Sequence, residues 1–436
     1  MKKDKSIKTS NKKTVKKKHN KKKTGLFKKI DNKFKKIERR IFKDSDNSNF
    51  SLFEVIIIIL ISILFGVIIG YLITFSKGSS ASDSNIEEIV ETYHNIVDEY
   101  YDNVDKDKIS EAAIKGMIDS LEDPYSNYMD TDTTGDFNEQ IEGTFVGIGV
   151  VVQYTGEYNT IIEVYKGGPA KKVGLKKNDI IIKVDGEDVK NVHGDEIAKK
   201  IRGVEGTHVV ITVRRGEEEL EFDVSRGKID IPSVSTEIFE RDDKKIGYLR
   251  IESFAANTYT QFNKALKKLE KKKIDSLILD VRSNPGGHLL QTRQILSLFF
   301  DKKTVLYQVQ AKKTKKKVYS LSNDKREYPI VVLIDSGSAS ASEILASCFK
   351  ENYKNINIIG NKSYGKGTVQ KSKSLNSGTS IKYTTEKWLT SKGKWINKKG
   401  VKPNIEVSLG EEYVNNPGHD TDAQLQKAIE ILKESK

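Results

Sequence analysis

The 436-residue chain contains a single cysteine, Cys348, and only seven prolines. One cysteine excludes an intramolecular disulfide, so the fold must be stable without covalent cross-links. The chain also lacks CxxC and HExxH patterns, and its six histidines lie in unrelated settings, so metal catalysis has no support and we expect no cofactor. Cys348 is either a small buried side chain or a reactive thiol, and the first interpretation is favoured.

Positive charge is unevenly distributed along the chain. The formal net charge is +14, but residues 1–50 alone carry 20 Lys/Arg and 5 Asp/Glu, which leaves the rest nearly neutral at −1. This tail has too few large apolar side chains to offset the entropy lost on ordering, so we expect residues 1–51 to be disordered. The basicity belongs to the tail and does not indicate that the folded part binds nucleic acid.

A long apolar run follows the tail. Residues 55–75 contain no charged residue, and a helix of this length, at about 1.5 Å per residue, spans the ~30 Å core of a membrane. The basic residues before it predict a cytoplasmic tail and an extracytoplasmic remainder. Because some fifty residues precede the run, an uncleaved anchor is favoured over a signal peptide, while Ser79, Ser80 and Ala81 leave later cleavage open. We expect a single-pass protein of the cell membrane whose tail contacts anionic lipids.

Three kinds of pattern follow the apolar run. Apolar residues at helical spacing predict helices at 84–100 and 106–121, the second ending at a turn that contains Pro124. Short β-branched runs between glycine turns predict a β-rich module at about 143–226, with strands at 147–152, 160–164, 179–184 and 209–213. From residue 245 onward, strands at 246–251, 276–281, 330–334 and 356–359 alternate with helices at 259–271, 289–299 and 341–349, which predicts an α/β core. The basic stretch 312–317 is interpreted as a solvated loop.

Ser340 follows the predicted strand 330–334 and opens a helix. A serine in this place lies near the positive end of the helix dipole and near free backbone N–H groups, which suits a hydroxyl that becomes an alkoxide. Ser340 and Glu343 also fit a capping box, whose only role is to close the helix terminus. This segment alone does not separate the two interpretations.

Lys366 lies between Gly365 and Gly367, after the next predicted strand. A lysine that acts as a base must be neutral, so burial or a nearby cation has to lower its pKa. Gln370, four residues later, can hydrogen-bond the amine without adding a charge that holds the proton; a surface amide is the alternative. The setting of Lys366 favours Ser340 as a nucleophile rather than a cap.

A glycine pair, Gly286 and Gly287, follows the predicted strand 276–281. Consecutive glycines permit a turn that exposes N–H groups, and one of them, with the amide of Ala341, would complete an oxyanion hole. Read alone, the pair is simply a turn. His288 is the one histidine close to this site in sequence, and no G-x-S-x-G elbow accompanies Ser340.

The β-rich module resembles a PDZ domain. The residues that carry the resemblance are Gly168-Pro169-Ala170, Gly174-Leu175, Asp179-Ile180-Ile181 and Val184-Asp185-Gly186. The resemblance implies a carboxylate-binding loop at Phe145, Val146, Gly147, Ile148 and Gly149. Exposed N–H groups in such a loop bind an anion, and a free strand edge adds a peptide strand. A β-domain with ordinary turn glycines is the alternative.

Taken together, the segments resemble the carboxyl-terminal processing peptidases, also called tail-specific proteases, from about residue 85 to the end. The segments concerned are 123–126, the PDZ-like module, 282–287, 338–343, 365–370, a strand at 400–405 and a helix at 422–426. The resemblance implies that Ser340 is the nucleophile, Lys366 the base and Gln370 its support. Asp335 and Ser336 depart from the commoner small or amide pair before Gly337, without changing a catalytic atom.

The expected fold is an α/β protease core with an inserted β-rich PDZ domain, a helical N-terminal cap and one transmembrane helix. The expected segments are the tail 1–51, the anchor 52–75, the cap 76–140, the PDZ domain 141–228, the protease core 229–410 and a C-terminal helical segment 411–436. The expected function is a membrane-anchored serine endopeptidase acting on unfolded or loosely folded proteins with apolar carboxyl termini. A catalytically inactive, membrane-tethered PDZ adaptor is the alternative. The sequence leaves the physiological substrate, the oligomeric state and the need for an activator open.

Overall fold

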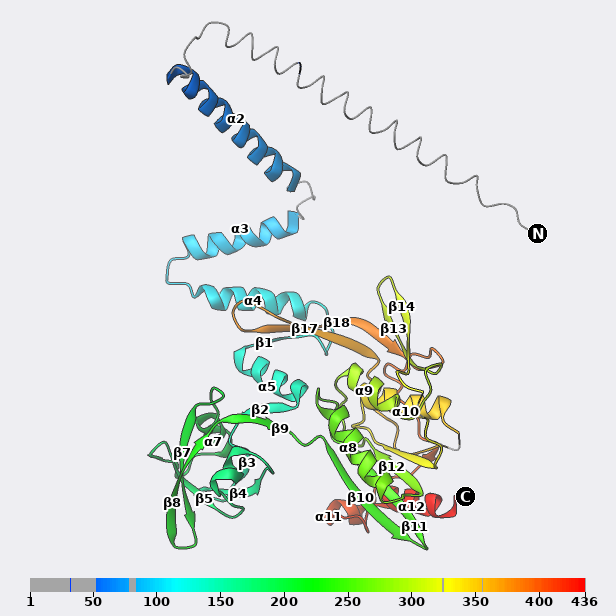
Figure 1. The fold of residues 1–436 in the computed structure, drawn as a ribbon. Coiled ribbons are helices and arrows are strands. Elements are labelled where there is room, and N and C mark those ends of the chain that lie inside the picture. The colour runs from blue at the N-terminus through cyan, green and yellow to red at the C-terminus, as the bar shows by residue number, and fades with distance from the viewer. Residues whose placement is uncertain (1–31, 33–51, 78–83, 324, 355, 436) are drawn as a thin grey trace, which may run out of the picture. The chain divides into compact units, whose positions relative to one another are not determined.

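The computed structural model describes residue 32 and residues 52–77, 84–323, 325–354 and 356–435 (Figure 1). The chain divides into two compact units, residues 1–106 and 107–436. The expected tail, residues 1–51, lies outside the described residues apart from Asn32.

The first unit contains the helices α2 (Leu52–Lys77) and α3 (Ser84–Glu99). The helix expected at 84–100 is therefore confirmed, and its apolar residues Ile86, Ile89 and Val90 are exposed. Among the residues described with their side chains, no helix has the length and apolar character needed to cross a membrane. The anchor expected at 52–75 stays a prediction.

The helical N-terminal region continues through α4 (Lys106–Asp119) and α5 (Thr131–Glu142). The carboxylate of Asp130 caps α5 by accepting a hydrogen bond from the Thr133 amide at 2.8 Å, and Gly143, at φ +69°, ends the helix. Between the two helices lies a strand that the sequence did not predict, β1 (Asn127–Met129), which pairs with β18 (Ser380–Leu389). The turn at 123–126 is therefore held against a distant part of the chain.

The β-rich module is present, and its sheet has the order β3-β4-β5-β7-β8 with β6 beside β5. Its elements are β2 (Thr144–Gly147), β3 (Val150–Tyr154), β4 (Asn159–Val164), α6 (Pro169–Val173), β5 (Ile180–Val184), β6 (Glu187–Asp188), α7 (Gly194–Ile201), β7 (His208–Arg215), β8 (Glu218–Ser225) and β9 (Gly227–Asp230). Fully buried Ile161, Ile181, Ile197 and Ile211 belong to its core. Because β2 and β9 pair with each other, the chain enters and leaves the module at neighbouring strands, as an inserted domain must.

One strand of this module was predicted incorrectly. The run 147–152 is not a single strand, because β2 ends at Gly147 and β3 begins at Val150. Gly149 adopts φ +80°, a backbone conformation that breaks an extended strand and that glycine adopts at little cost. The break creates a loop directly before the edge strand β3.

A six-stranded sheet forms the α/β core, in the order β10-β11-β12-β15-β16-β19, and only the β10–β11 pair is antiparallel. Its elements are β10 (Val234–Arg241), β11 (Lys244–Ile251), α8 (Thr258–Lys271), β12 (Ser276–Asp280), α9 (Leu289–Leu296), β15 (Ile330–Ile334), α10 (Ala341–Asn352), β16 (Asn357–Gly360), β19 (Ile405–Glu406), α11 (Glu411–Asn415) and α12 (Ala423–Glu434). Leu277 and Leu279 pack in the cluster that includes α8, α9 and α10, while Ile278 packs with α12. Alternate side chains of one strand thus enter two cores, so the sheet is covered on both faces.

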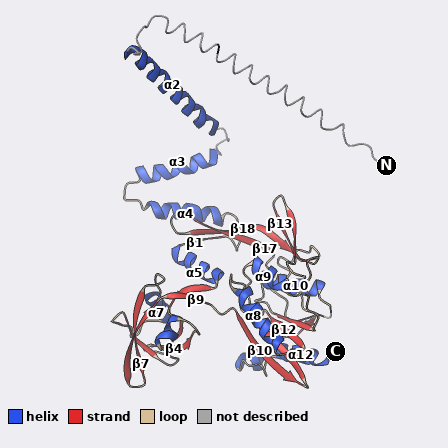
Figure 2. Cartoon of the chain, in the orientation of Figure 1, coloured by secondary structure: helices blue, strands red, loops and turns tan. Residues whose placement is uncertain are grey.

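A second, antiparallel sheet was not predicted. It contains β13 (Val305–Ala311), β14 (Lys315–Tyr319) and β17 (Thr368–Ser374) together with β1 and β18, a group distinct from β10 and β12 in Figure 2. The interpretation of 312–317 as a loop is wrong, because Lys315–Lys317 belong to β14; lysines are frequent on edge strands, which they protect from further pairing. The strand expected at 400–405 is also shorter than predicted, since β19 begins only at Ile405.

Candidate active site

Three loops meet at one edge of the parallel sheet. Residues 281–288 follow β12, residues 335–340 follow β15, and residues 361–367 follow β16. β15 pairs with β12 on one side and with β16 on the other, all in parallel, so the carboxyl ends of the three strands lie next to one another. The fold therefore brings together the sequence segments that contain Gly286, Ser340 and Lys366.

Ser340 is the N-terminal cap of α10 and has an unusual backbone conformation, with φ +53° and ψ −109°. A positive φ at a residue other than glycine costs on the order of 1–3 kcal/mol and persists only where the surroundings impose it. Here the next nine residues, Ala341–Phe349, are all buried, so the helix that follows Ser340 cannot readily shift. The serine thus stands at the positive end of a fixed helix, with its side chain partly exposed.

The glycine pair lies directly against Ser340. A Cβ on Gly286 would come within 2.9 Å of the Ser340 Cβ and of the Ala341 nitrogen, and a Cβ on Gly287 would come within 2.3 Å of the Phe254 carbonyl oxygen. The two glycines adopt φ +104° and φ +140°, so both positions exclude a side chain. The Gly286 N–H already donates to the Asn284 Oδ1 at 2.8 Å. That leaves Gly287 as the member of the pair whose amide is better suited to a substrate oxyanion.

The buried carboxylate of Glu343 joins the serine loop to the lysine loop. Its Oε2 accepts hydrogen bonds from the backbone N–H of Ser340 at 2.8 Å and of Lys366 at 2.9 Å. Its Oε1 accepts from the Ser363 hydroxyl at 2.6 Å and from the Gly365 N–H at 2.7 Å. Burial raises the pKa of Glu343, while the four hydrogen bonds oppose that rise. The sequence suggested a capping role only, whereas the carboxylate contacts the backbone on both sides of the candidate site.

Lys366 is held mainly through its backbone. In addition to the Glu343 contact, its carbonyl oxygen accepts a hydrogen bond from the indole of Trp388 at 2.7 Å. A Cβ on Gly365 would come within 3.0 Å of the Lys399 nitrogen, and one on Gly367 within 2.7 Å of the Trp395 indole nitrogen. The two glycines thus allow the backbone of this loop to approach its neighbours closely.

The amine of Lys366 is in an environment that disfavours its charge. Burial lowers the pKa of Lys366, and the positive charge of Lys382 lowers it further, while the carboxylates of Asp123 and Glu343 act in the opposite direction. Its Nζ lies 4.7 Å from the centroid of the Tyr125 ring. The net shift is downward, which is the direction a general base requires.

Gln370 lies on β17, where it faces Thr384 of β18. Its amide Nε2 donates to the hydroxyls of Thr368 and Thr384, each at 2.9 Å. Among the described side chains, these hydroxyls and not the amine of Lys366 are its hydrogen-bond partners. The amide is thus fixed in place beside the lysine loop rather than free on the surface.

Asp335 organises the loops on the serine side, although sequence analysis gave it no role. Its carboxylate accepts hydrogen bonds from the Ser283 N–H at 2.8 Å and the Ser283 hydroxyl at 3.0 Å. It also accepts from the backbone N–H groups of Gly337 at 3.0 Å and Ser338 at 2.9 Å. Aspartate two and three residues before such N–H groups is a turn-forming pattern, so the local bonds were detectable in the sequence, but the bonds to the distant Ser283 were not.

A buried ion-pair network lies beneath the glycine loop. Arg282, only 6% exposed, contacts the carboxylates of Asp280 at 2.6 Å and Asp422 at 2.8 Å, and it donates to Gln424 at 3.0 Å. Asp422 also accepts from the Leu425 N–H and so caps α12. The carboxylates raise the pKa of Arg282 although burial opposes this, so the guanidinium is charged. The network joins the C-terminal helix to the loop that carries Gly286 and Gly287.

In the PDZ-like module, the five loop residues named from the sequence are divided between a strand and a turn. Phe145, Val146 and Gly147 belong to β2 and pair with β9, while Ile148 and Gly149 form the turn before β3. In the described backbone, neither Ile148 nor Gly149 is the donor of a backbone hydrogen bond, although their carbonyls accept from Ala170 and Tyr165. β3 is the edge strand of its sheet. The turn and the edge together have the features that bind a peptide carboxylate and add its strand.

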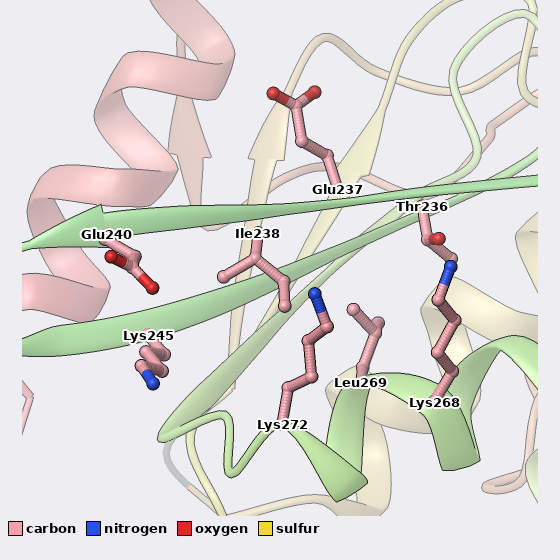
Figure 3. A pocket seen from close by; sticks show the side chains of 8 residues that line it. All are labelled: Thr236, Glu237, Ile238, Glu240, Lys245, Lys268, Leu269 and Lys272. Carbon is pink, nitrogen blue, oxygen red and sulfur yellow. The ribbon is translucent and has the colours of Figure 1, made fainter.

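Other features of the described residues offer no competing chemistry. A cavity of about 370 Å³ between β10, β11 and α8 is lined mostly by charged side chains, among them Lys268 of α8 and Lys272 just after that helix (Figure 3). None of its residues belongs to the three loops. Cys348 is fully buried, and burial raises the pKa of its thiol to about 12, so its interpretation as a small buried side chain is confirmed. Within the described part of the chain, no group of His, Cys, Asp and Glu residues is arranged to hold a metal ion.

Comparison with known proteins connects these features to described families. Residues 245–407 match the model of peptidase family S41, residues 73–133 match the activating protease CtpB N-terminal domain, and residues 160–215 match a PDZ domain. The chain is 39% identical over 348 residues to the carboxy-terminal processing protease CtpA of Bacillus subtilis, an alignment that covers 79% of this chain and 74% of that protein. It is 37% identical over 345 residues to CtpB of the same organism, covering 78% of this chain and 72% of that protein. Among solved structures, the photosystem II D1 C-terminal processing protease is similar, with 25% identity, a TM-score of 0.45, and coverage of 74% of this chain and 86% of that one.

Proposed function

The chain belongs to peptidase family S41, and on that premise we propose that Ser340 is its nucleophile and Lys366 its general base. The protein is a carboxy-terminal processing serine protease with a PDZ domain. The observation that carries the proposed pair is the carboxylate of Glu343, one oxygen of which binds the backbone N–H of both residues. The backbones of the two residues are thereby held on either side of one atom.

The proposed reaction begins when the neutral amine of Lys366 removes the proton of the Ser340 hydroxyl. The Ser340 oxygen attacks the carbonyl carbon of the scissile peptide bond and forms a tetrahedral intermediate. As that intermediate collapses, Lys366 gives its proton to the leaving amine and an acyl-enzyme remains. Water, deprotonated by the same amine, then releases the carboxylate product and regenerates Ser340.

The oxyanion of that intermediate needs donors close to Ser340. We assign this role to the backbone N–H of Ala341, the first residue of α10, and to that of Gly287. The choice of Gly287 over Gly286 is supported by the bond that the Gly286 N–H makes to Asn284. Because neither glycine has a side chain, the backbone of Gly286 packs directly against Ser340 and that of Gly287 against Phe254.

The PDZ module supplies substrate recognition in this proposal. The carboxyl end of an unfolded or loosely folded protein binds the turn formed by Ile148 and Gly149 and adds a strand to the edge of β3. Phe145, Val146 and Gly147 hold that turn in place through their pairing with β9. The module thus captures tails that end in apolar residues and delivers the chain to Ser340.

A membrane location is the second part of the proposal. α2 carries no charge between Val55 and Phe75, and its described apolar side chains, from Ile57 to Ile69, are exposed. Such a helix after a Lys-rich tail is typical of a single-pass anchor with a cytoplasmic N-terminus. The catalytic part would then work outside the cytoplasm, while the tail contacts anionic lipids and not nucleic acid.

The catalytic assignment is tested on the full chain in detergent, with an unfolded protein that ends in an apolar tail as substrate. We expect Ser340→Ala and Lys366→Ala each to lower turnover by at least about 10³-fold while leaving the unfolding midpoint and tail binding unchanged. Equal turnover by the parent and both variants would refute the assignment. Binding of the tail without cleavage by the parent would instead favour a PDZ adaptor without catalytic activity.

The anchor is tested by fractionation of cells that produce the chain. We expect the parent in the membrane fraction, and a variant with Leu60→Lys, Leu64→Lys and Ile68→Lys outside it, because charges at the centre of a spanning helix each cost about 2.5–3.5 kcal/mol. Recovery of both proteins in the same fraction would contradict the anchor. Fusing residues 1–50 to an unrelated protein and finding no affinity for anionic vesicles would remove the lipid contact.

A further inference from the structure

The surroundings of Lys366 include residues from outside the segment that matches the peptidase family. The turn at 123–126 lies within the stretch matched by the N-terminal domain model, yet it packs against β18. The Asp123 Oδ2 accepts hydrogen bonds from the Ser126 hydroxyl at 2.6 Å and from the Thr384 hydroxyl at 2.5 Å. The Thr384 N–H in turn donates to the Ser126 hydroxyl at 3.1 Å. Two of these three hydrogen bonds join the turn to the strand, and Asp123 accepts one of those two as well as the bond within the turn.

Asp123 is ionised at neutral pH. Burial pulls its pKa upward, but the hydrogen bonds from Ser126, Thr384 and the Tyr125 amide outweigh burial and leave the pKa below its ordinary value. An ionised carboxylate can only accept hydrogen bonds. The Thr384 hydroxyl proton is therefore committed to Asp123, and the Thr384 oxygen is left to accept from another group.

The donor to Thr384 is the amide of Gln370. Its Nε2 lies 2.9 Å from the Thr384 hydroxyl and 2.9 Å from the Thr368 hydroxyl, so both amide protons are engaged. The nitrogen and oxygen of a glutamine amide have similar shapes, and only the hydrogen-bond network determines which way the group points. Because Thr384 must donate to Asp123, the nitrogen of Gln370 has to face Thr384. The amide oxygen is then the end of Gln370 available to a donor such as an amine.

The same turn also covers the amine of Lys366. The Tyr125 ring lies 4.7 Å from the Lys366 Nζ, and burial together with a hydrogen bond to Tyr364 raises the pKa of the Tyr125 phenol to about 12. The phenol is thus neutral at pH 7, and its ring lies beside the amine. The backbone position of Tyr125 depends on Asp123, whose Oδ1 accepts from the Tyr125 N–H at 3.2 Å.

We propose that Asp123 is a positioning residue for the general base: through Thr384 it orients Gln370 so that the glutamine oxygen is presented to the amine of Lys366. The proposal rests on the proposed roles of Ser340 and Lys366. A purely structural role is the competing explanation, since an aspartate at the first position of a turn often serves only to stabilise that turn. The two explanations differ in kinetics, because a structural role changes stability and leaves the chemistry of folded enzyme unaltered.

The test uses matched variants of the full chain, assayed for kcat and KM across pH with an unfolded substrate. We expect Thr384→Val to lower kcat about tenfold with KM within about twofold, and Thr384→Ser, which keeps the hydroxyl, to restore kcat to within about twofold of the parent. Asp123→Asn should lower kcat by about tenfold. It should also move the acid limb of the pH profile to lower pH, because the negative charge that raises the Lys366 pKa is removed. The other groups that act on the amine or lie beside it, which are Glu343, Lys382 and Tyr125, are unchanged in these variants.

Lys373→Ala, an exposed position on the strand of Gln370, is the control and should leave kcat, KM and the pH profile unchanged. The proposal is overturned if Asp123→Asn and Thr384→Val alter only the unfolding midpoint, or if Thr384→Ser is no better than Thr384→Val. If Asp123→Asn does not fold, the threonine pair alone decides. Wild-type turnover by Lys366→Ala would show that the proposed base is wrong, whereas an inactive Lys366→Ala beside an unaffected Thr384→Val would refute only the positioning role.

Discussion

The two sides of the candidate site are built by different means. The nucleophile side, residues 281–288 and 335–343, is defined by backbone conformation: Ser283, Gly286, Gly287 and Ser340 all adopt positive φ, and α10 behind them is buried. The base side, residues 363–370 with β18 and the 123–126 turn, is defined by side chains that lie close to the Lys366 amine or orient its neighbours. Carboxylates, hydroxyls and a second lysine provide these contacts.

The nucleophile side therefore fixes the positions of groups, while the base side sets the pKa of Lys366. An alkoxide and an oxyanion require donors at fixed positions, so rigid backbone suits the nucleophile side. A general base requires a pKa matched to the working pH, and partly exposed side chains such as Lys382 can change that pKa without moving the backbone. Substitutions that disturb the buried support of the nucleophile side should therefore lower stability, while substitutions of the charged side chains around Lys366 should shift the pH profile.

The largest effect on stability is expected at the buried ion pairs of Arg282, which pack against the loop that carries Gly286 and Gly287. Arg282→Met leaves the carboxylates of Asp280 and Asp422 buried without a cation, and breaking such a pair costs about 3–5 kcal/mol of unfolding free energy. Urea or thermal unfolding measures this loss. Lys427→Met, which breaks an exposed pair with Glu430, is the matched control and should cost less than about 1 kcal/mol. Similar losses of unfolding free energy in the two variants would mean that the Arg282 ion pairs do not stabilise the nucleophile side more than an exposed ion pair would.

The next largest effect is expected where the two sides meet. Glu343→Gln replaces one accepting oxygen with an NH₂ group that faces N–H donors, so the serine and lysine loops should separate slightly. Displacements of about 1 Å reduce turnover by about 100-fold, and we expect a loss of that size in kcat with KM little changed. Glu351→Gln, near the other end of α10, should stay within about twofold of the parent. A rise in KM with kcat unchanged would show that Glu343 does not hold the serine and lysine loops together.

The smallest effect should appear as a shift in pH dependence. Burial lowers the pKa of Lys366, and Lys382 lowers it further by repulsion. Lys382→Gln removes that repulsion, so the Lys366 pKa rises, the acid limb of kcat/KM moves to higher pH, and a smaller fraction of the base is neutral at pH 7. At pH 7 we expect kcat/KM to fall roughly threefold, which is less than the tenfold change in the protonation ratio that a full pKa unit would produce. A limb that stays in place, or moves to lower pH, would contradict side-chain tuning of the base.

The sequence predicted the nucleophile side better than the base side, for a physical reason. Continuous apolar runs such as 330–334 are typical of buried parallel strands, and β15 has those bounds. β17 and β18 instead carry Lys371, Lys373 and Lys382, which obscure the apolar pattern of a strand. The hydrogen bonds of Asp335 to Ser283 and of Asp123 to Thr384 connect residues far apart in the chain, and no local pattern indicates such partners.

The contact between Asp123 and Thr384 spans 261 positions of the chain, and that separation determines when an active enzyme can exist. During synthesis the turn at 123–126 leaves the ribosome long before β18 does. The loop that contains Ser340 is also made before Gln370 and Thr384, the side chains proposed to orient Lys366. Contacts of such long range form late in folding. If Asp123 has the proposed positioning role, a nascent chain therefore lacks a fully oriented base until β18 has been made and has packed against the turn.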